Sequence, residues 1–149
     1  MTCSLVVNSK SGNTRMVSGA IKRTLQAAGV EFVHAAALSD DADADQVALE
    51  AQGACAADTV LVGFWCDKGA CTPSVATLLS ALHGKRVFLF GTCGFGASEE
   101  YFRQIIDRVT SNLADDAELV GWAMCQGKMG PAVKQRYEAM LEQDPDNAR

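Results

Sequence analysis

Residues 9–15, with the sequence SKSGNTR, combine side chains suited to binding an anion. A short apolar run precedes this segment and an amphipathic run follows it, so we expect it to connect a strand to a helix. Backbone N–H groups and the helix dipole attract negative charge at such a corner, and glycine allows a close approach. The segment predicts a site for a terminal phosphate monoester; a helix cap and tight turn without a ligand is the alternative. The candidate ligand-binding residues are Ser9, Lys10, Ser11, Gly12, Asn13 and Thr14.

Two later segments offer aromatic side chains for a flat ring system. Trp65 ends an apolar run and leads into CDKGAC, and Phe95 lies between two glycines in TCGFG. Aromatic residues that reach one crevice from different loops suit a flat, apolar ligand. Phe64 also belongs to this set by position, although a core role is the favoured interpretation for it. The candidates from these segments are Phe64, Trp65, Cys66, Asp67, Lys68, Gly69, Thr92, Cys93, Gly94, Phe95 and Gly96.

The elements that must position these loops alternate between strand and helix. Apolar runs predict strands at residues 3–8, 30–36, 58–65, 86–91 and 118–125. Helical spacing predicts helices from Asn13, over 46–52, from Pro73, after Ser98 and from Gly130. This order predicts an α/β fold, a doubly wound three-layer sandwich around a five-stranded parallel sheet of order 2-1-3-4-5. We expect one domain over residues 1–149, with a polar tail from about 144.

Ligands of such sheets bind beyond the carboxyl ends of the strands, so the loops after strands 1, 3 and 4 should form one site. Several phosphate and nucleotide sites are excluded by spacing. The chain has no G-x-x-x-x-G-K-[ST] string, and G-x-G-x-x-G does not follow the first strand. A response-regulator site is disfavoured because Asn8, Ser9, Trp65 and Cys66 stand where acidic residues are needed.

The string S-x-S-G-N-T resembles the signature of flavodoxins, whose corresponding loop wraps the phosphate of FMN. The resemblance covers essentially the whole chain and implies FMN as cofactor, with residues 9–14 around the phosphate. It also places Trp65 and residues 92–96 beside the flavin ring, and it implies that a peptide within residues 66–69 turns on reduction. One departure is Phe95, because flavodoxins often stack a tyrosine at the later loop. The segments GFWCDKGA and CQGKMGP resemble a compact flavodoxin-like branch of anaerobic bacteria, some members of which accompany a bilirubin reductase.

Six cysteines leave several interpretations open. Cys66, Cys71, Cys93 and Cys125 all fall near the carboxyl ends of expected strands, where a metal or iron–sulfur site is one alternative. The spacing matches no tight C-x-x-C pattern, so we predict no metal site. A Cys66–Cys71 redox pair is a second alternative. Buried thiols without a reaction are favoured over both.

Composition and charge limit the class of partner. The formal net charge is −5, which disfavours nucleic acid, and no apolar run is long enough to span a membrane. The sequence shows no signal-type start, so we expect a cytoplasmic protein with neither a nucleic-acid nor a membrane partner. Redox proteins, a reductase and an acceptor enzyme, are the expected partners. Asp40–Asp45 and Glu99–Glu100 are candidates for an acidic docking rim.

Three functions fit these observations. The first is an FMN-binding electron-transfer protein that passes electrons between a reductase and an acceptor enzyme, without a catalytic residue of its own. The second is an NAD(P)H-dependent flavin or quinone reductase on the same fold, although Arg15 is the arginine expected near the crevice. The third is an accessory subunit of a larger flavin reductase. The first is favoured.

Overall fold

The computed structural model describes residues 2–10, 12–67, 69–93 and 98–126. Strands and helices alternate along this part of the chain, as the sequence predicts. The strands are β1 Thr2–Val7, β2 Glu31–Ala37, β3 Thr59–Trp65, β4 Arg86–Cys93 and β5 Glu118–Gln126. The helices are α1 Asn13–Ala27, α2 Ala44–Ala54, α3 Pro73–Ser80 and α4 Glu99–Thr110. The helix predicted from Gly130 and the expected polar tail both lie outside the described residues.

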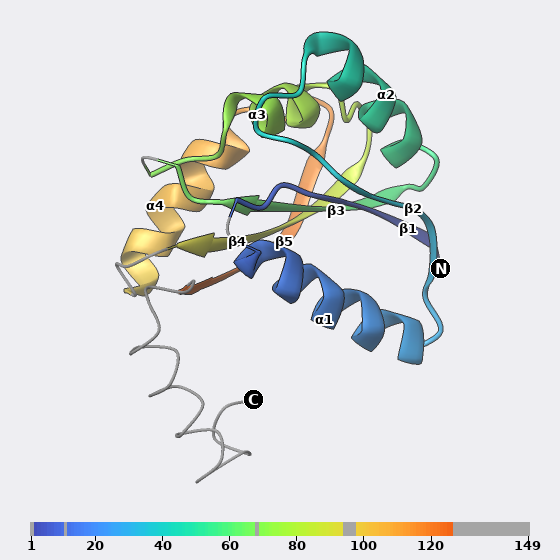
Figure 1. The fold of residues 1–149 in the computed structure, drawn as a ribbon, viewed down its shortest axis with the longest axis horizontal. Helices are drawn as coiled ribbons and strands as arrows, with labels where there is room; N and C mark the ends of the chain where they lie inside the picture. The colour runs from blue at the N-terminus through green and yellow to red at the C-terminus, as the bar shows by residue number, and fades with distance from the viewer. Residues whose placement is uncertain (1, 11, 68, 94–97, 127–149) are drawn as a thin grey trace, which may run out of the picture.

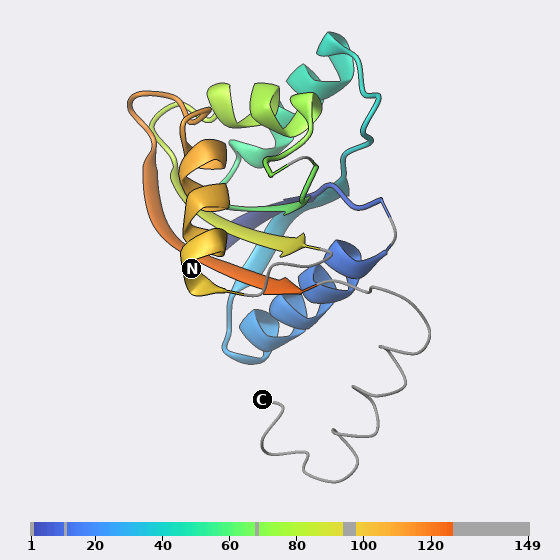
Figure 2. The same cartoon turned by 90° about the vertical axis from the view of Figure 1, so that its left-hand side faces the viewer.

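The five strands form a single parallel sheet in the order β2-β1-β3-β4-β5. The predicted fold class is therefore confirmed. The chain reverses its direction of winding between β1 and β3, and the carboxyl ends of these strands lie at one edge (Figures 1 and 2). The register pairs Val7 with Gly63 and Trp65 with Thr92, which brings the loops after β1, β3 and β4 together.

The helices cover the two faces of the sheet unequally in the described part. Helix α1 lies on one face, and α2, α3 and α4 lie on the other (Figure 1). Alternate residues of the central strands supply the two cores. The larger core joins β3 and β4 to α2, α3 and α4, and includes the fully buried Phe64, Leu78 and Ile105. The smaller core joins the sheet to α1, with Phe90 at its centre.

Local sequence signals explain where the helices begin. Asp43 caps α2, and its carboxylate accepts from the Gln46 backbone N–H while the Gln46 side chain accepts from the Asp43 backbone. This reciprocal box starts α2 at Ala44, two residues before the predicted start at Gln46. Ser98 caps α4 by accepting from Tyr101 N–H, and Pro73 occupies the first turn of α3, both as predicted.

Strand β4 runs two residues beyond its predicted end, to Cys93, because it continues to pair with β5 through Gln126. Thr92 and Cys93 are thus strand residues and not loop residues. Across the described residues, no helix combines the length and the apolar character needed to cross a membrane.

Candidate functional site

The loop after β1 ends in a helix N-terminus that is open to a ligand. Gly12 is the N-cap residue of α1, with φ of 92°, a left-handed conformation that favours glycine. An added Cβ at Gly12 would meet no atom within 4 Å, so the space beside it is clear in the described structure. The Ser9 hydroxyl accepts from the Gly12 N–H at 3.1 Å and fixes the turn. Gly12 has no side chain that could cap the helix, so the cap residue itself satisfies none of the N–H groups of the first turn.

Thr14 is turned inward and connects this loop to β3 and β4. Its side chain is buried, and its hydroxyl oxygen lies 2.7 Å from the Thr92 hydroxyl oxygen and donates to the Phe64 carbonyl at 3.4 Å. In this structure the Thr14 and Thr92 hydroxyls hold the amino end of α1 against the sheet. They position the loop, whereas Ser9 and Lys10 lie at the outer side of it.

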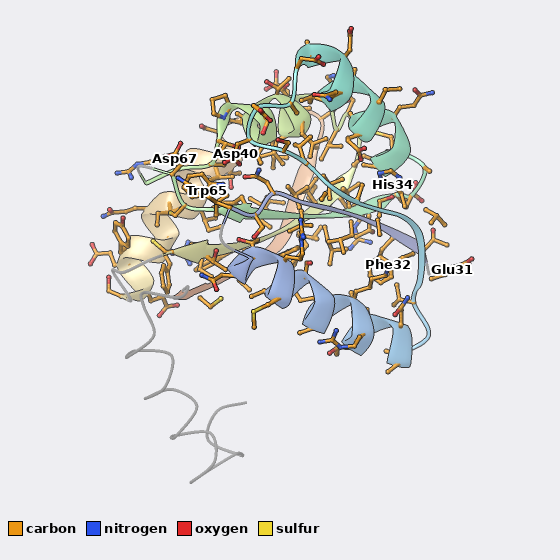
Figure 3. The ribbon with its side chains drawn as sticks, in the orientation of Figure 1. Glu31, Phe32, His34, Asp40, Trp65 and Asp67 are labelled. Atoms are coloured by element: carbon orange, nitrogen blue, oxygen red, sulfur yellow. The ribbon has the colours of Figure 1, made fainter. Side chains whose placement is uncertain are left out.

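Trp65 leaves the end of β3 in the direction of the loops after β1 and β2. Its indole N–H donates to Asp40 Oδ1 at 2.9 Å, and the two side chains lie near each other in Figure 3. Asn8 Nδ2 donates to the same oxygen at 2.7 Å. Asn8 is buried; it also donates to the Leu38 carbonyl and accepts from the Thr72 hydroxyl. These bonds fix the indole at the switch point of the sheet, between the ends of β1 and β3.

Lys10 covers one face of this indole. Its Nζ atom lies 5.0 Å from the centre of the Trp65 ring, a cation–π distance. A ring system that stacks on Trp65 must therefore use the opposite face or displace the ammonium group. The contact joins the predicted phosphate loop to the predicted ring loop directly.

The loop after β3 is a tight turn held by backbone bonds. Asp67 N–H donates to the Ala70 carbonyl at 2.7 Å, and Ala70 N–H donates to the Asp67 carbonyl at 3.1 Å. Gly69 has φ of 82°, so the conformation depends on glycine. From α4, Arg108 Nη1 donates to the Gly69 carbonyl at 3.1 Å and braces the turn from outside.

Arg108 and Asp40 are site residues that the sequence analysis missed. Arg108 is 39 residues away from the turn, and a basic residue in the last turn of a helix has a sufficient explanation in the helix dipole. The sequence places Asp40 in a docking rim, but in the structure its carboxylate accepts hydrogen bonds from Trp65 and Asn8. No local pattern distinguishes these two roles.

Burial raises the pKa of two thiols of this region, Cys66 and Cys71. It raises the pKa of Cys66 to about 12, with a hydrogen bond to Cys93 and repulsion from that thiolate as further causes, while Arg108 opposes the shift. Burial likewise raises the pKa of Cys71 to about 11. The described residues contain no group of three or more metal-ligating side chains that converge.

A hollow of about 560 Å³ lies on the β2 side of the first loop. Ser9 and Lys10 line it, but Trp65, Gly69 and Thr92 do not. Its charged residues are Lys10 and Arg15 on one side and Asp40 and Asp41 on the other. The hollow therefore adjoins the phosphate loop without being the crevice between β1, β3 and β4.

Most of the described candidates gather at this crevice, with one correction. Phe64 is fully buried in the larger core, because it points toward α3 and α4, so its side chain is a core residue and offers no ring contact. Gly12 and Gly69 lie in the loops, Asn13 and Thr14 begin α1, Trp65 ends β3, and Thr92 and Cys93 end β4. The candidates outside the described residues are Ser11, Lys68, Gly94, Phe95 and Gly96.

Comparison with known proteins relates the chain to flavodoxins. Residues 4–149 match the family model described as "Flavodoxin domain". The flavodoxin-like domain-containing protein BilS of Clostridium symbiosum (strain WAL-14163) is 33% identical over 156 residues, covering 100% of this chain and 80% of that protein. BilS of Clostridioides difficile (strain CD3) is 38% identical over 90 residues, 60% of this chain, and the match spans about half of that protein, 51%.

Solved structures give the same result for the fold. Reduced Megasphaera elsdenii flavodoxin superposes with a TM-score of 0.54 at 25% identity, covering 84% of this chain and 85% of that chain. A Lactobacillus acidophilus flavoprotein in complex with FMN superposes with a TM-score of 0.57 at 17% identity, covering 83% and 92%. With a family match over nearly its whole length and the strand order 2-1-3-4-5, the chain belongs to the flavodoxin domain family.

Proposed function

We propose that this protein binds FMN and transfers electrons between a reductase and an acceptor enzyme. The observation that carries the proposal is the α1 N-terminus. Gly12 leaves this end of the helix open, and the Ser9 hydroxyl and the backbone shape the turn around it. A helix N-terminus with glycine at the cap position, beside hydroxyl donors and a lysine, suits a phosphate dianion.

The residues present fit FMN, because those suited to its phosphate lie next to the one suited to its ring. Ser9, Lys10, Gly12 and Asn13 would hold the phosphate, and Trp65 would contact the ring. The Lys10–Trp65 contact at 5.0 Å shows that the two loops are neighbours, as a ligand with a phosphate at one end and a ring at the other requires. Bound FMN would supply the reversible acceptance of one or two electrons.

The chain's own residues would set the environment of the ring. The turn at residues 67–70 presents backbone groups next to Trp65, and Arg108 fixes the orientation of the Gly69 carbonyl. The Asp40 carboxylate orients the indole through its N–H. A net charge of −5 disfavours added negative charge on a bound ring, which lowers the potential at which the ring accepts its last electron.

Docking of partners would use fewer of the acidic residues than the sequence predicts. Asp40 bonds to Trp65, and Asp43 caps α2, so both carboxylates have structural tasks. Glu99 and Glu100 are exposed in the first turn of α4 and are available to a basic partner. Salt-dependent association through such charges is typical of transient redox complexes.

A reductase with its own pyridine nucleotide site has less support. The hollow beside the first loop contains Lys10 and Arg15, but Asp40 and Asp41 face the same space. Two carboxylates beside two cations disfavour a polyanionic dinucleotide.

Stopped-flow kinetics of the FMN-loaded protein distinguish these functions. For the carrier, we expect slow NADH and NADPH oxidation alone, and fast flavin reduction once a flavodoxin reductase is added. The rate should fall with salt, and Glu99→Gln with Glu100→Gln should weaken that salt dependence. Rapid NAD(P)H oxidation by the protein alone would overturn the carrier role. Copurification of a larger flavoprotein, with no flavin bound by this chain, would favour the accessory subunit.

A further inference from the structure

We propose that Cys66 and Cys93 form a reversible disulfide by exchange with a low-molecular-weight disulfide. The two residues lie at the ends of β3 and β4, the strands that lead into the predicted ring loops. All six cysteines of the chain are free thiols in this structure.

Strand register places these two cysteines side by side. Trp65 pairs with Thr92, and Cys66 N–H donates to the Thr92 carbonyl at 2.8 Å, so the next pair in register is Cys66 with Cys93. Neighbouring strands lie about 4.8 Å apart, within the 4.4–6.8 Å range of Cα separations in disulfides. Residues that alternate along a strand share a face, so Cys66 lies on the face of Phe64, where Cys93 belongs to the same core.

The electrostatics of the two thiols agree with this placement. Cys93 acts on Cys66 through a hydrogen bond and through charge. Tyr101, in the first turn of α4, has its pKa raised chiefly by the Cys93 thiolate, with Cys66 contributing. Cys66, Cys93 and Tyr101 therefore converge under α4, with Arg108 and Asp67 as the charged groups that also act on Cys66.

Cys71 does not belong to this group. Burial raises the pKa of Cys71, and a hydrogen bond to its own backbone lowers it; neither Cys66 nor Cys93 contributes to this pKa shift. The antiparallel bridge between Asp67 and Ala70 sets Cys66 and Cys71 opposite each other at the next position, so this pair is the competitor that the test must distinguish. Cys93 is taken as the partner because it is the thiol that acts on Cys66 through a hydrogen bond.

The exchange proceeds in two balanced steps. The half-buried Cys66, as its thiolate, attacks one sulfur of a disulfide RSSR, which forms a mixed disulfide and releases RS⁻. Cys93, buried behind it, then attacks Cys66 Sγ as its thiolate and releases a second RS⁻. The two thiols lose two protons and two electrons, and RSSR gains both to become two RSH.

The bond would be strained and easily reduced. Cβ vectors of neighbouring parallel residues point in the same direction, so the two Cβ atoms must approach to about 3.8 Å for the bond to close. Cys66 stands just beyond the last residue of β3, where the backbone can adjust. Strained disulfides have less negative reduction potentials, so a mild thiol reductant should reverse the bond.

Peptide mapping of the full chain provides the test. Trypsin cleaves after Lys68 and so separates Cys66, in peptide 24–68, from Cys71, in peptide 69–85; Cys93 is in peptide 87–103. A Cys55→Ser variant leaves one cysteine in peptide 24–68. After treatment with oxidised 2-mercaptoethanol at pH 8.5 under native conditions, we expect the protein to lose the mass of two hydrogen atoms and to yield a 24–68/87–103 cross-link.

The controls separate this pair from its competitors. Cys71→Ser in the same background should retain the cross-link, whereas Cys66→Ala and Cys93→Ala should abolish it, and dithiothreitol should restore the thiols. A 24–68/69–85 cross-link would overturn the proposal, as would stable mixed disulfides on both Cys66 and Cys93. Complete resistance of the two thiols while Cys125 reacts would overturn it as well.

Discussion

The buried hydroxyl pair of Thr14 and Thr92 gives a quantitative prediction. The two oxygens are 2.7 Å apart, and the side chains are 1% and 4% exposed. Replacement of either threonine by valine keeps the shape of the side chain but removes one partner. Thr92→Val leaves Thr14 with only the 3.4 Å bond to the Phe64 carbonyl, and Thr14→Val leaves the Thr92 hydroxyl without its bond.

A buried hydroxyl that loses its partner destabilises a protein by about 1–3 kcal/mol, whereas removal of both partners is nearly neutral. We therefore expect each single substitution to lower the free energy of unfolding by about 1–2 kcal/mol. The double substitution should cost less than the sum of the two, with a coupling of about 1 kcal/mol. In thermal unfolding, each kcal/mol corresponds to about 2–4 °C.

Urea unfolding of the four proteins measures this coupling. Ser4→Ala is the matched control, because the Ser4 hydroxyl is buried and has no hydrogen-bond partner, so its removal should leave stability unchanged or raised. Additive single substitutions, or a Ser4→Ala loss as large as that of Thr92→Val, would refute the interpretation that the hydroxyl pair fastens α1 to the sheet.

Three further predictions concern the cap of α2, the turn at residues 67–70 and the thiols. Asp43→Ala should lower the free energy of unfolding by about 1 kcal/mol through loss of the capping box, and Asp45→Ala should not; circular dichroism melts compare the two. Gly69→Ala should weaken FMN binding and raise amide hydrogen exchange in the turn, because the φ of Gly69 is 82° and the added Cβ would lie 2.7 Å from Arg108 Nη1. Gly84→Ala is the control for backbone strain alone, because Gly84 also has a positive φ but has open space beside it. In the folded protein the pKa of Cys66 is about 12 and that of Cys71 is about 11, whereas the pKa of a cysteine in the unfolded chain is about 8.5. The stability that these thiols contribute is therefore present below about pH 8.5 and is lost as the pH rises toward 11–12. Thermal melts from pH 8 to 11 should show this fall, and Cys71→Ala should flatten it; an equal slope in the variant would count against the burial effect.

The sequence predicts the fold well because the signals are local. Apolar runs, helical spacing and the helix-start signals at Pro73 and Ser98 all act within a few residues, and with the rules for parallel crossovers they lead to the strand order 2-1-3-4-5. The position of the first loop follows from the same signals, since a strand end and a helix start are both visible in the residue types.

The contacts within the site depend on register and on long-range packing. Asp40 meets Trp65 across 25 residues, and Arg108 meets Gly69 across 39. The inward turn of Thr14 depends on the position of Thr92 in the sheet, and the Cys66–Cys93 pairing depends on which strand neighbours β3. Residue types alone do not contain this information, and the position of Phe64 at a strand end does not by itself distinguish a ring contact from a core residue.

The central claim is that the α1 N-terminus binds the phosphate of FMN beside Trp65. Its most direct test is a fluorescence titration of a Trp122→Phe variant, in which Trp65 is the remaining tryptophan, with FMN and with riboflavin. The account predicts saturable quenching of Trp65 by FMN, and riboflavin binding weaker by at least about tenfold, the equivalent of one hydrogen bond to a charged group. Equal binding of FMN and riboflavin, or no quenching by either, would contradict it.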